Sequence, residues 1–541
     1  MKIKFILLLI FLISCGSDSS NPNLNSDIDE EVGEYMEEEY DEELEKELAI
    51  KRSSELGCKG FHTHDNSGET IYMPCSTHDE YEQLISEEED YDDKNEDYED
   101  DEYDEDYEDK ENEDYEDEDY EDEDYEDDSE DDSLYDEYGE WDKGSLYYDT
   151  SSTTSTGWYI GQGTDREEHV HEGMQTSDGG FIAIGHHWEK EEDPTGFTDM
   201  IILKTDSNGN ELWQTVIGTP DKFDVGYSVN ELSDGYIASG GLYKDGFQKS
   251  AIVKLDFNGQ IIWQKIFSHN GVGAIRGTEV INNDEIVVTG YKEGDEEGFL
   301  FISDGSKGFI TKMSTTGEVI WDKDLSAMQG TKVKQTSQGG FVVGSVEWVD
   351  VGLNASMHYL DSNGNTLSTK LFGGNNNVQL FDMDITSNDY VVFTGHTTGY
   401  QTANWDCIVM LIDDQGNEVW KNIFGNPRGY DPKYILDECY GVRETLDGGF
   451  VVTGGTGDHS DYFGTGHPNG TSDDWKVLLS EFDKDGNMTS INVFGGGFDK
   501  GNDAGEFIDV TSDGGYIIFS DTDSKGSKGP NNFGFLYIKN P

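Results

Sequence analysis

The chain has 541 residues, and its 117 acidic residues outnumber its 35 basic residues, which gives a formal net charge of −82. So negative a chain is a poor direct ligand for nucleic acid or for anionic lipid headgroups, and the charge argues against both partners. The acids concentrate between Glu87 and Asp142, so the composition separates an acidic segment from the rest of the chain.

Lys2 and Lys4 precede an apolar run, Ile6 to Ile13, that is too short to span a bilayer. The run ends in Leu12-Ile13-Ser14-Cys15-Gly16, which resembles the signal of bacterial lipoproteins. The resemblance implies removal of residues 1–14 and acylation of Cys15, which would anchor the chain to the membrane of a bacterial cell envelope. Gly16 favours the outer membrane by the same resemblance. The alternative is an ordinary secretory signal that contains a cysteine.

Residues 15–57 are a glutamate-rich linker in which apolar residues recur every four positions between Val32 and Leu48. This spacing allows a short amphipathic helix, and a solvated segment is the equal alternative.

Residues 58–82 form a small island rich in cysteine and histidine. A zinc site could use His62, His64 and His78, but the compact spacing of known zinc fingers is absent. A lipoprotein faces an oxidising compartment, where two nearby cysteines pair. The island therefore favours a disulfide between Cys58 and Cys75 over a metal site.

Residues 83–156 are a low-complexity tract of Glu, Asp and Tyr, in which Lys94 and Lys110 are the basic residues between Glu87 and Asp142. A segment of this composition buries too little apolar surface to fold, and its self-repulsion extends it. We expect a disordered acidic stalk. Its carboxylates could also hold Ca²⁺ or a basic partner weakly, since nothing fixes their geometry.

A repeated module begins after the stalk. Its first part is a tight turn such as Asp178-Gly179-Gly180, followed by an aromatic or aliphatic residue and a β-branched run. Glycine supplies the backbone angles that a two-residue hairpin requires, and the runs are too short for helices. The residue after the turn recurs seven times, as Phe181, Tyr236, Ile286, Phe341, Tyr390, Phe450 and Tyr516.

A second turn of the type Asp206-Ser207-Asn208-Gly209 follows in six copies, and a tryptophan comes four residues later. The tryptophans are Trp213, Trp263, Trp321 and Trp420, and two copies have Ser368 and Ser490 instead. With a further short strand before each first turn, every repeat has four strands at a period typical of propeller blades. We expect the tryptophans to pack between neighbouring blades.

The seventh copy lacks its outer strand, and Trp158-Tyr159-Ile160-Gly161 before the first copy matches the missing segment. The sequence therefore predicts an all-β fold, a seven-bladed β-propeller over residues 157–541 closed by its N-terminal strand, which removes exposed sheet edges. Alternating residues such as Ile182, Ile202 and Val253, with Ile184, Val343 and Val451, should fill the interior.

The two turn motifs, Asp-Gly-Gly-Phe/Tyr-Ile/Val-x-x-Gly and Lys-x-Asp-x-Asn-Gly-x-x-x-Trp, resemble the repeats of secreted bacterial β-propellers. They are also similar to the tryptophan-docking repeats of PQQ-type propellers, which include the lipoprotein of the outer-membrane β-barrel assembly machinery. The resemblance covers residues 157–541 and implies the fold. The adjacent cysteine pair with which the quinone enzymes hold their cofactor is absent, so no cofactor is expected.

Two further features of the repeats have simple interpretations. The Asp-Ser-Asn-Gly turns resemble the start of a calcium loop, but the glycine comes too early and the closing glutamate is missing, so a hairpin turn explains them. Cys407 is expected in the third strand of one blade and Cys439 in the first strand of the next. Buried free thiols are the default expectation for this pair, and pairing depends on the sheet geometry.

No hydrolase elbow, zinc-protease motif or phosphate loop occurs in the sequence. The leading hypothesis is a non-enzymatic binding or scaffolding propeller on the envelope, and the alternative is a carbohydrate-active lipoprotein. The long connections should form the binding face for a protein or a glycan, because loops on a rigid scaffold carry recognition and aromatic residues anchor both. The candidate residues are His186, His187, Trp188, Tyr430, Tyr434, His459, Tyr462 and His467.

Overall fold

The computed structural model describes residues 61–66, 69–74, 157–189, 196–295, 306–349, 352–402, 404–425, 427, 435–458, 475–495 and 502–539. The described residues form strands and turns, without a helix that could cross a membrane. The chain divides into two compact units, residues 18–127 and the remainder.

In the smaller unit the described residues form one antiparallel hairpin, β1 (Phe61–Asn66) and β2 (Glu69–Pro74). In the register of this hairpin, His62 lies opposite Met73 and His64 opposite Ile71. Cys15, Cys58, Cys75 and His78 lie outside the described residues, so the anchor, the disulfide and the weak metal alternative stay predictions.

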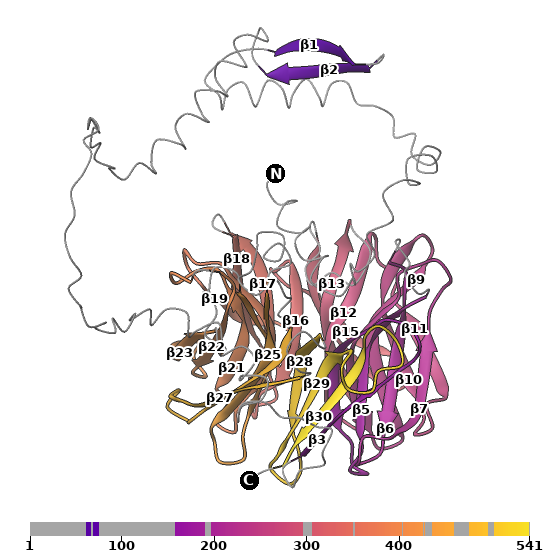
Figure 1. Cartoon of the computed structure of the whole chain (residues 1–541), viewed down its shortest axis with the longest axis vertical. Helices are drawn as coiled ribbons and strands as arrows, with labels where there is room; N and C mark the ends of the chain where they lie inside the picture. The colour runs from indigo at the N-terminus through magenta and orange to yellow at the C-terminus, as the bar shows by residue number, and fades with distance from the viewer. Residues whose placement is uncertain are drawn as a thin grey trace, which may run out of the picture. The chain divides into compact units, whose positions relative to one another are not determined.

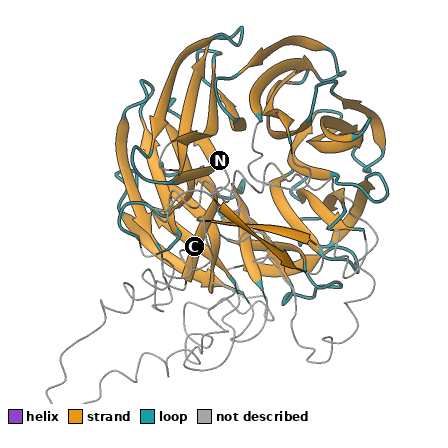
Figure 2. Ribbon diagram, turned by 90° about the horizontal axis from the view of Figure 1, so that it is seen from above, coloured by secondary structure: helices purple, strands orange, loops and turns teal. Residues whose placement is uncertain are grey.

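The larger unit is the predicted seven-bladed β-propeller, and each blade is a four-stranded antiparallel sheet (Figure 1). The strands of blades 1 to 6 are paired in chain order, and the view from above shows the sheets arranged around a central axis (Figure 2). Blades 1 to 3 are β4 (Glu168–Gln175), β5 (Phe181–Trp188), β6 (Thr198–Thr205) and β7 (Glu211–Ile217); β8 (Val225–Leu232), β9 (Gly235–Lys244), β10 (Phe247–Leu255) and β11 (Ile261–Ile266); and β12 (Val272–Asn282), β13 (Glu285–Gly294), β14 (Lys307–Ser314) and β15 (Val319–Asp324). Blades 4 to 6 are β16 (Gln329–Gln335), β17 (Phe341–Val349), β18 (Gly352–Leu360) and β19 (Thr366–Phe372); β20 (Val378–Ile385), β21 (Val391–Thr397), β22 (Asp406–Ile412) and β23 (Glu418–Phe424); and β24 (Ile435–Glu444), β25 (Phe450–Asp458), β26 (Lys476–Phe482) and β27 (Met488–Phe494).

Blade 7 closes the ring. It consists of β28 (Asp503–Val510), β29 (Tyr516–Thr522) and β30 (Asn532–Ile538), with β3 (Gly157–Gln162) as its outer strand (Figure 1). Trp158 lies opposite Tyr537 and Ile160 opposite Phe535. The buried hydroxyl of Tyr159 donates to Asp503 over 3.1 Å and lies 2.8 Å from the hydroxyl of Ser520. The predicted closure by the N-terminal strand is confirmed.

Hydrophobic clusters fill the spaces between blades. In one of them, Ile237 and Ile252 of blade 2 pack with Ile275 and Val288 of blade 3. The six interior residues predicted from strand alternation, Ile182, Ile184, Ile202, Val253, Val343 and Val451, are all fully buried. Burial of aliphatic side chains between sheets is therefore the main stabilising contribution to the ring.

The tryptophans dock each blade on the next, as expected. The indole of Trp213 in blade 1 donates to the carbonyl of Phe257 in blade 2 over 3.0 Å, and its ring covers the turn glycine Gly259. A Cβ on Gly259 would lie 2.5 Å from that ring, so glycine is required there for its small size as well as for its positive φ of 77°. The same packing joins four other pairs: Trp158 with Gly209, Trp263 with Gly317, Trp321 with Gly364 and Trp420 with Gly486.

The two serines at tryptophan positions have separate explanations. Ser490 lies in blade 6, and blade 7 takes its outer strand from β3, so it has no turn between its third and fourth strands on which a tryptophan could dock. Ser368 lies in blade 4, where Tyr359 and Lys370 cover the glycine of the next blade, Gly416.

The Asp-x-Asn-Gly turns are hairpin turns stabilised by their own first residue. The carboxylate of Asp206 accepts from the backbone amides of Asn208 and Asn210 over 2.8 and 2.9 Å, and from the side-chain amide of Asn210 over 2.9 Å. Local hydrogen bonds of this kind explain why aspartate begins such turns. The lysine that precedes this motif has a partner in the other turn, because Lys204 contacts Asp178 at 3.1 Å.

The expectation of free thiols at Cys407 and Cys439 is wrong. The two residues form a disulfide between β22 and β24, with their Cα atoms 5.2 Å apart. Each cysteine is on the strand predicted for it, and the packing of blade 5 against blade 6 brings the Cα atoms within bonding range. The disulfide therefore links two neighbouring blades covalently.

His396 is a fully buried histidine opposite Cys407 in the register of blade 5. Its ring lies between Phe381 and Trp405, with centroids 4.7 and 4.4 Å away. Burial lowers its pKa from the model-compound value of 6.5 to about 3. Below about pH 6.5 the imidazole of His396 is therefore protonated in the unfolded state but stays neutral in the folded state.

We expect the propeller to lose stability through His396 as the pH falls from about 6.5 toward 3. At pH 5 the contribution is about 2 kcal/mol, because the folded pKa lies below the unfolded one and each pH unit below 6.5 adds about 1.4 kcal/mol. His396→Phe should reduce the decline between pH 7 and pH 5 by this amount in denaturant unfolding, whereas His62→Phe in the hairpin should leave it unchanged. Equal declines for the parent protein and His396→Phe would contradict the assignment.

Ring closure provides a second test. Deletion of residues 157–162 removes β3 with Trp158 and Tyr159 and leaves the long edge of β30 unpaired. Because the buried Tyr159 and the partly buried Trp158 are both lost, we expect a loss of roughly 5 kcal/mol or more, seen as a much lower melting temperature or as aggregation. Deletion of residues 16–140 is the control and should leave propeller melting nearly unchanged. Equal melting of the two variants would show that β3 does not close the ring.

Candidate functional site in the central channel

The first strand of every blade lines the central channel and carries a β-bulge at the same place. In blade 1, Val170 pairs with Gly185 and Glu172 with Ile184, so His171 is the extra residue that falls outside the strand register. The equivalent residues of the other blades are Tyr227, Arg276, Thr331, Phe381, Tyr440 and Glu506. A bulge turns the extra residue away from the regular alternation. The seven residues, one from each blade, are called the bulge ring below.

In five blades the last glycine of the first sequence motif pairs with the residue just before the bulge. A Cβ on Gly185 would lie 1.9 Å from the carbonyl oxygen of His169, two residues before the bulge. The corresponding distances are 1.9 Å at Gly240, 2.0 Å at Gly290, 1.7 Å at Gly395 and 2.0 Å at Gly454, so a side chain at these positions would require a shift of the backbone. The same position holds Ser345 in blade 4 and Ser520 in blade 7, so the bulge itself does not require glycine.

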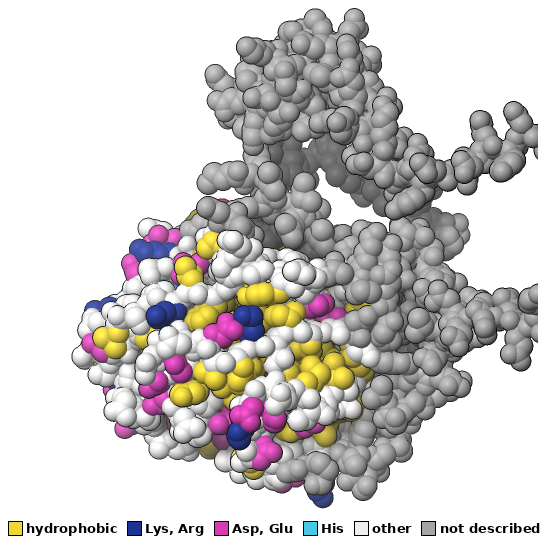
Figure 3. Space-filling model, turned by 90° about the vertical axis from the view of Figure 1, so that its left-hand side faces the viewer, with side chains coloured by type: hydrophobic (Ala, Val, Ile, Leu, Met, Phe, Trp, Pro, Cys, Tyr) yellow, Lys and Arg dark blue, Asp and Glu magenta, His cyan; other side chains and the backbone are white. Residues whose placement is uncertain are grey.

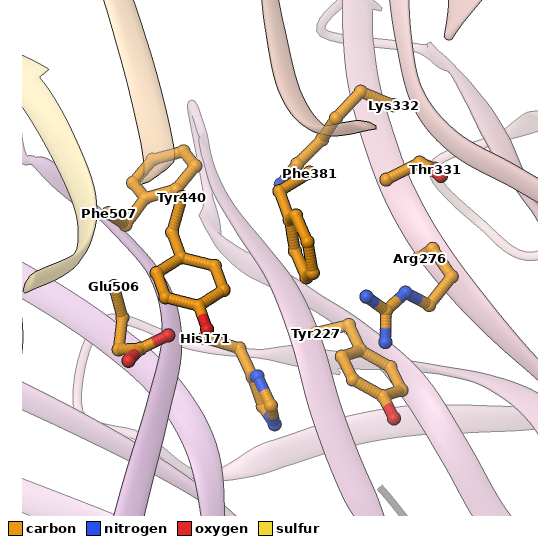
Figure 4. Close-up of a pocket in the computed structure, with 9 residues that line it drawn as sticks. All are labelled: His171, Tyr227, Arg276, Thr331, Lys332, Phe381, Tyr440, Glu506 and Phe507. Atoms are coloured by element: carbon orange, nitrogen blue, oxygen red, sulfur yellow. The ribbon is translucent and has the colours of Figure 1, made fainter. Parts of the chain in front are cut away.

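The bulge ring surrounds a cavity of about 30 Å³ that Lys332 and Phe507 also line. Figure 4 shows the side chains of His171, Tyr227 and Tyr440 approaching one another from different strands. The guanidinium of Arg276 lies 4.0 Å from the ring centroid of Tyr227. A cavity of this volume holds about two water molecules.

Charged side chains from several blades meet in the channel on one side of this cavity. Lys332 of blade 4 pairs with Glu172 of blade 1 and lies 4.7 Å from the ring of Phe507. Arg443 of blade 6 pairs with Asp382 of blade 5 at 2.6 Å. Lys334, Glu279, Asp384 and Asp509 extend this group, which is named the charged plug here. The plug lies toward the ends of the first strands, where the tight turns are.

Toward the beginnings of the same strands lies a cluster of histidines and acids at the junction of blades 1 and 7. Nε2 of His171 is 3.1 Å from Nδ1 of His186, and the ring centroid of His169 is 4.6 Å from that of His171. His169 contacts Asp521 through Nδ1, and its Nε2 is 3.9 Å from Glu506. All five residues come from first or second strands, so rigid sheet positions them.

The charges of this cluster follow from burial and from neighbouring groups. Burial opposes protonation of His169, but the carboxylates of Asp521 and Glu506 outweigh it and raise the pKa of His169 to about 9. Burial, together with the nearby charge of His169, lowers the pKa of both His171 and His186 well below the usual range. Burial also raises the pKa of Glu506, and it raises that of Glu438 to about 7. The cluster therefore combines one cationic and two neutral imidazoles with carboxyl groups that take up protons readily.

The structure brings three of the predicted binding residues to this region. His186, His187 and Trp188 were expected at the start of a loop, but β5 continues through Trp188. Side chains alternate along a strand, so His186 is fully buried in the histidine cluster, whereas His187 is 3.4 Å from Asp199 and remains partly exposed. Trp188 is partly exposed and lies 4.8 Å from the ring of His186. Tyr430, Tyr434, His459, Tyr462 and His467 lie outside the described residues.

The bulge ring and its neighbours His169 and Asp521 were not singled out from the sequence. One available signal was the second-strand glycine, which recurs in five of the seven blades opposite the bulge. No residue type is common to all of the bulge positions, so a search for repeated motifs does not find them.

A different surface runs around the outside of the ring. The fourth strands expose an aliphatic residue next to the tryptophan position: Leu212, Ile262, Ile320, Leu367 and Val419. Figure 3 shows apolar patches on one side of the ring, separated by polar and charged side chains. The described aliphatic residues are therefore distributed around the circumference and are not gathered in one place.

No protein-family model matches the chain, and no curated protein matches it. Solved structures resemble it at low identity. The WD40 β-propeller domain of Doa1 is 12% identical, with a TM-score of 0.42, over 71% of this chain and 97% of that one. YCF48 bound to D1 peptide is 11% identical, with a TM-score of 0.42, over 74% and 99%. A protein of unknown function from Bacteroides caccae is 11% identical, with a TM-score of 0.34, over 55% and 90%.

Proposed function

We propose that the chain is a non-enzymatic binding or scaffolding propeller, displayed on the bacterial envelope by a lipid anchor at Cys15 and the acidic stalk. The partner is a protein or a glycan that contacts the side of the ring where the second and third strands are joined, called the connection side here. The β-propeller fold is consistent with binding or scaffolding, and the envelope location follows from the lipoprotein-like signal.

One observation supports binding at the surface rather than turnover in the channel. The cavity inside the bulge ring is about 30 Å³, and ion pairs between blades occupy the channel beside it. About two water molecules fit there, which is too little space for a sugar ring or a peptide side chain inside this cavity. The described part of the channel therefore favours recognition of either class of partner on the outer surface.

The two sides of the ring differ in how they are built. The tight turns on one side use the same hydrogen bonds from blade to blade, as in Asp206 to Asn210 and Asp361 to Asn365. On the connection side, Trp188 and His187 reach the end of β5 with part of their surface exposed. Aromatic residues that are held by a rigid strand bind with little loss of conformational entropy.

Trp188→Ala is the direct test of this face. We expect it to weaken capture of the native partner from envelope extracts by about tenfold or more, since aromatic anchors commonly contribute over 1 kcal/mol to recognition. Capture is measured well below the melting temperature, because Trp188 also packs on His186 and its loss lowers stability.

Phe257→Ala is the matched control, since Phe257 is an aromatic residue with 46% of its surface exposed on the opposite side of the ring. It should leave capture intact. Loss of capture in Phe257→Ala together with full capture in Trp188→Ala would assign binding to the turn side. A glycan array separates the two classes of partner, and release of reducing sugar from its hits would contradict a non-enzymatic role.

The anchor has its own test. Cys15→Ser should move the protein from the membrane fraction to the soluble fraction and abolish labelling by radioactive palmitate, because the thiol is the acylation site of a lipoprotein. Cys58→Ser is the control and should remain labelled and membrane-bound. Continued labelling of Cys15→Ser would contradict acylation at Cys15, and absence of labelling in the parent protein would favour an ordinary secretory signal.

A further inference from the structure

Three ionisable side chains meet inside the junction of the first and last blades. His169 is on β4 of blade 1, whereas Glu506 and Asp521 are on β28 and β29 of blade 7. Their exposed fractions are 4%, 7% and 5%. One nitrogen or oxygen atom of each lies within 4.8 Å of the corresponding atoms of the other two. Burial of three ionisable groups in one place is unfavourable unless their charges neutralise one another or a bound ion neutralises them.

The imidazole of His169 is held in a defined orientation. Asp521 contacts Nδ1 with one carboxylate oxygen and accepts from the backbone amide of Val170 with the other, over 3.0 Å. This leaves Nε2 directed toward Glu506, at 3.9 Å. A carboxylate bound to one imidazole nitrogen while the other faces a second ligand is the usual arrangement around metal-binding histidines.

The cavity offers the remaining coordination positions. Glu506 and His171 line it, and it holds about two water molecules. His171 also lies edge-on against the ring of His169, with centroids 4.6 Å apart. Glu506 thus reaches both the cavity and His169, which does not itself line the cavity, so water from the cavity would complete the coordination of an ion beside Glu506.

We propose that His169 and Glu506 bind a divalent first-row transition ion, with Zn²⁺ as the representative, and that Asp521 positions the imidazole. Two ligands on a tetrahedral zinc ion are roughly 3.3 Å apart, so the 3.9 Å between Nε2 and the carboxylate oxygen closes with a small side-chain movement. The ion would bridge blade 7 and blade 1 at the place where the ring closes. This inference goes beyond binding of a partner on the connection side and does not depend on it.

The donor atoms select the class of ion. An imidazole nitrogen with carboxylate oxygens suits Zn²⁺ and its neighbours in the first transition row, whereas Ca²⁺ and Mg²⁺ prefer oxygen ligands throughout. A proton on Nε2 of His169 is the competing occupant of the same space, and in that case the three residues form a buried ion-pair network without metal. The two possibilities differ in whether the propeller takes up zinc.

The test uses the full-length protein, extracted in detergent and treated with a chelator. Zn²⁺ is then titrated while propeller unfolding is followed by tryptophan fluorescence, and Co²⁺ binding is followed by visible absorption. We expect Zn²⁺ to raise the melting temperature in a concentration-dependent way, since binding to the folded state alone stabilises it. Ca²⁺ at the same concentration should leave propeller melting unchanged even where it binds the acidic stalk.

The variants separate this site from other zinc ligands. Glu506→Gln keeps the shape of the side chain and should weaken zinc binding by more than about tenfold, and Asp521→Asn should weaken it by about 10- to 100-fold through loss of imidazole orientation. His358→Gln is the matched control, because His358 is a fully buried histidine of blade 4 beside a single carboxylate, Glu347 at 3.6 Å. It should retain the response.

The double variant Cys58→Ser, Cys75→Ser removes the thiols of the hairpin region and should also retain the response. A sulfur-to-cobalt charge-transfer band that disappears in this double variant would assign Co²⁺ to those cysteines instead. Absence of any zinc effect on the melting of the chelator-treated parent protein would overturn the proposal. A zinc effect that survives unchanged in both Glu506→Gln and His169→Gln would overturn it as well.

Discussion

Every blade of this propeller buries its two faces only by packing between two neighbours, so the stability of each blade depends on closure of the whole ring. The clusters between blades consist largely of aliphatic residues from first, second and third strands, and the docked tryptophans add a contact on the outside. An open array would leave one apolar face and one strand edge exposed at each end. Pairing of β3 with β30 removes both exposed ends in one step.

Closure also concentrates unusual chemistry at one junction. Blade 7 is the blade built from both ends of the propeller, and its first two strands contribute Glu506 and Asp521, which face His169 of blade 1. Elsewhere in the described part of the channel, charges from different blades compensate one another, as in Arg443 with Asp382 and Lys332 with Glu172. At the junction acids outnumber bases, and burial raises the pKa of Glu506 accordingly. The junction of blades 1 and 7 therefore differs from the other contacts between blades in charge as well as in connectivity.

The fold could be predicted because its signals are local and repeated. A turn glycine such as Gly209 and a tryptophan such as Trp213 occupy fixed places in the repeat. The glycine is needed for the positive φ of the turn, and the tryptophan packs on the turn glycine of the next blade. The missing outer strand of the last repeat was equally visible, since Trp158 to Gly161 matches it in the sequence. Features that arise from contacts between blades were not visible in this way. The Cys407–Cys439 disulfide joins residues 32 positions apart on different sheets, and its formation depends on a distance that no local pattern encodes.

The candidate site was harder to predict for a related reason. His186 was expected in a loop because polar and aromatic residues follow the apolar run of β5, whereas the strand continues and alternation buries that side chain. His169 and Asp521 come from distant parts of the chain, and only the closed ring brings them together. Comparison of the repeats with one another reveals the residues that are the same in each blade. Residues that occur in a single blade, such as these two, do not stand out in it.

Equivalent positions that differ are more informative about function. The aliphatic residues of the fourth strands are alike in successive blades and surround the ring evenly, which fits a preference of strands for such side chains and gives no blade a distinct role. The bulge ring is the opposite case, because one backbone feature repeats seven times and presents His, Tyr, Arg, Thr, Phe, Tyr and Glu in turn. Packing does not require this chemical variety, since both Thr331 and Arg276 occupy the same backbone position, and Ser345 and Ser520 replace the glycine opposite the bulge in two blades. The propeller therefore keeps its backbone uniform and varies the side chains where they meet at the axis. Ion binding is best sought in the channel beside the histidine cluster, and partner recognition on the connection side rather than around the outer strands.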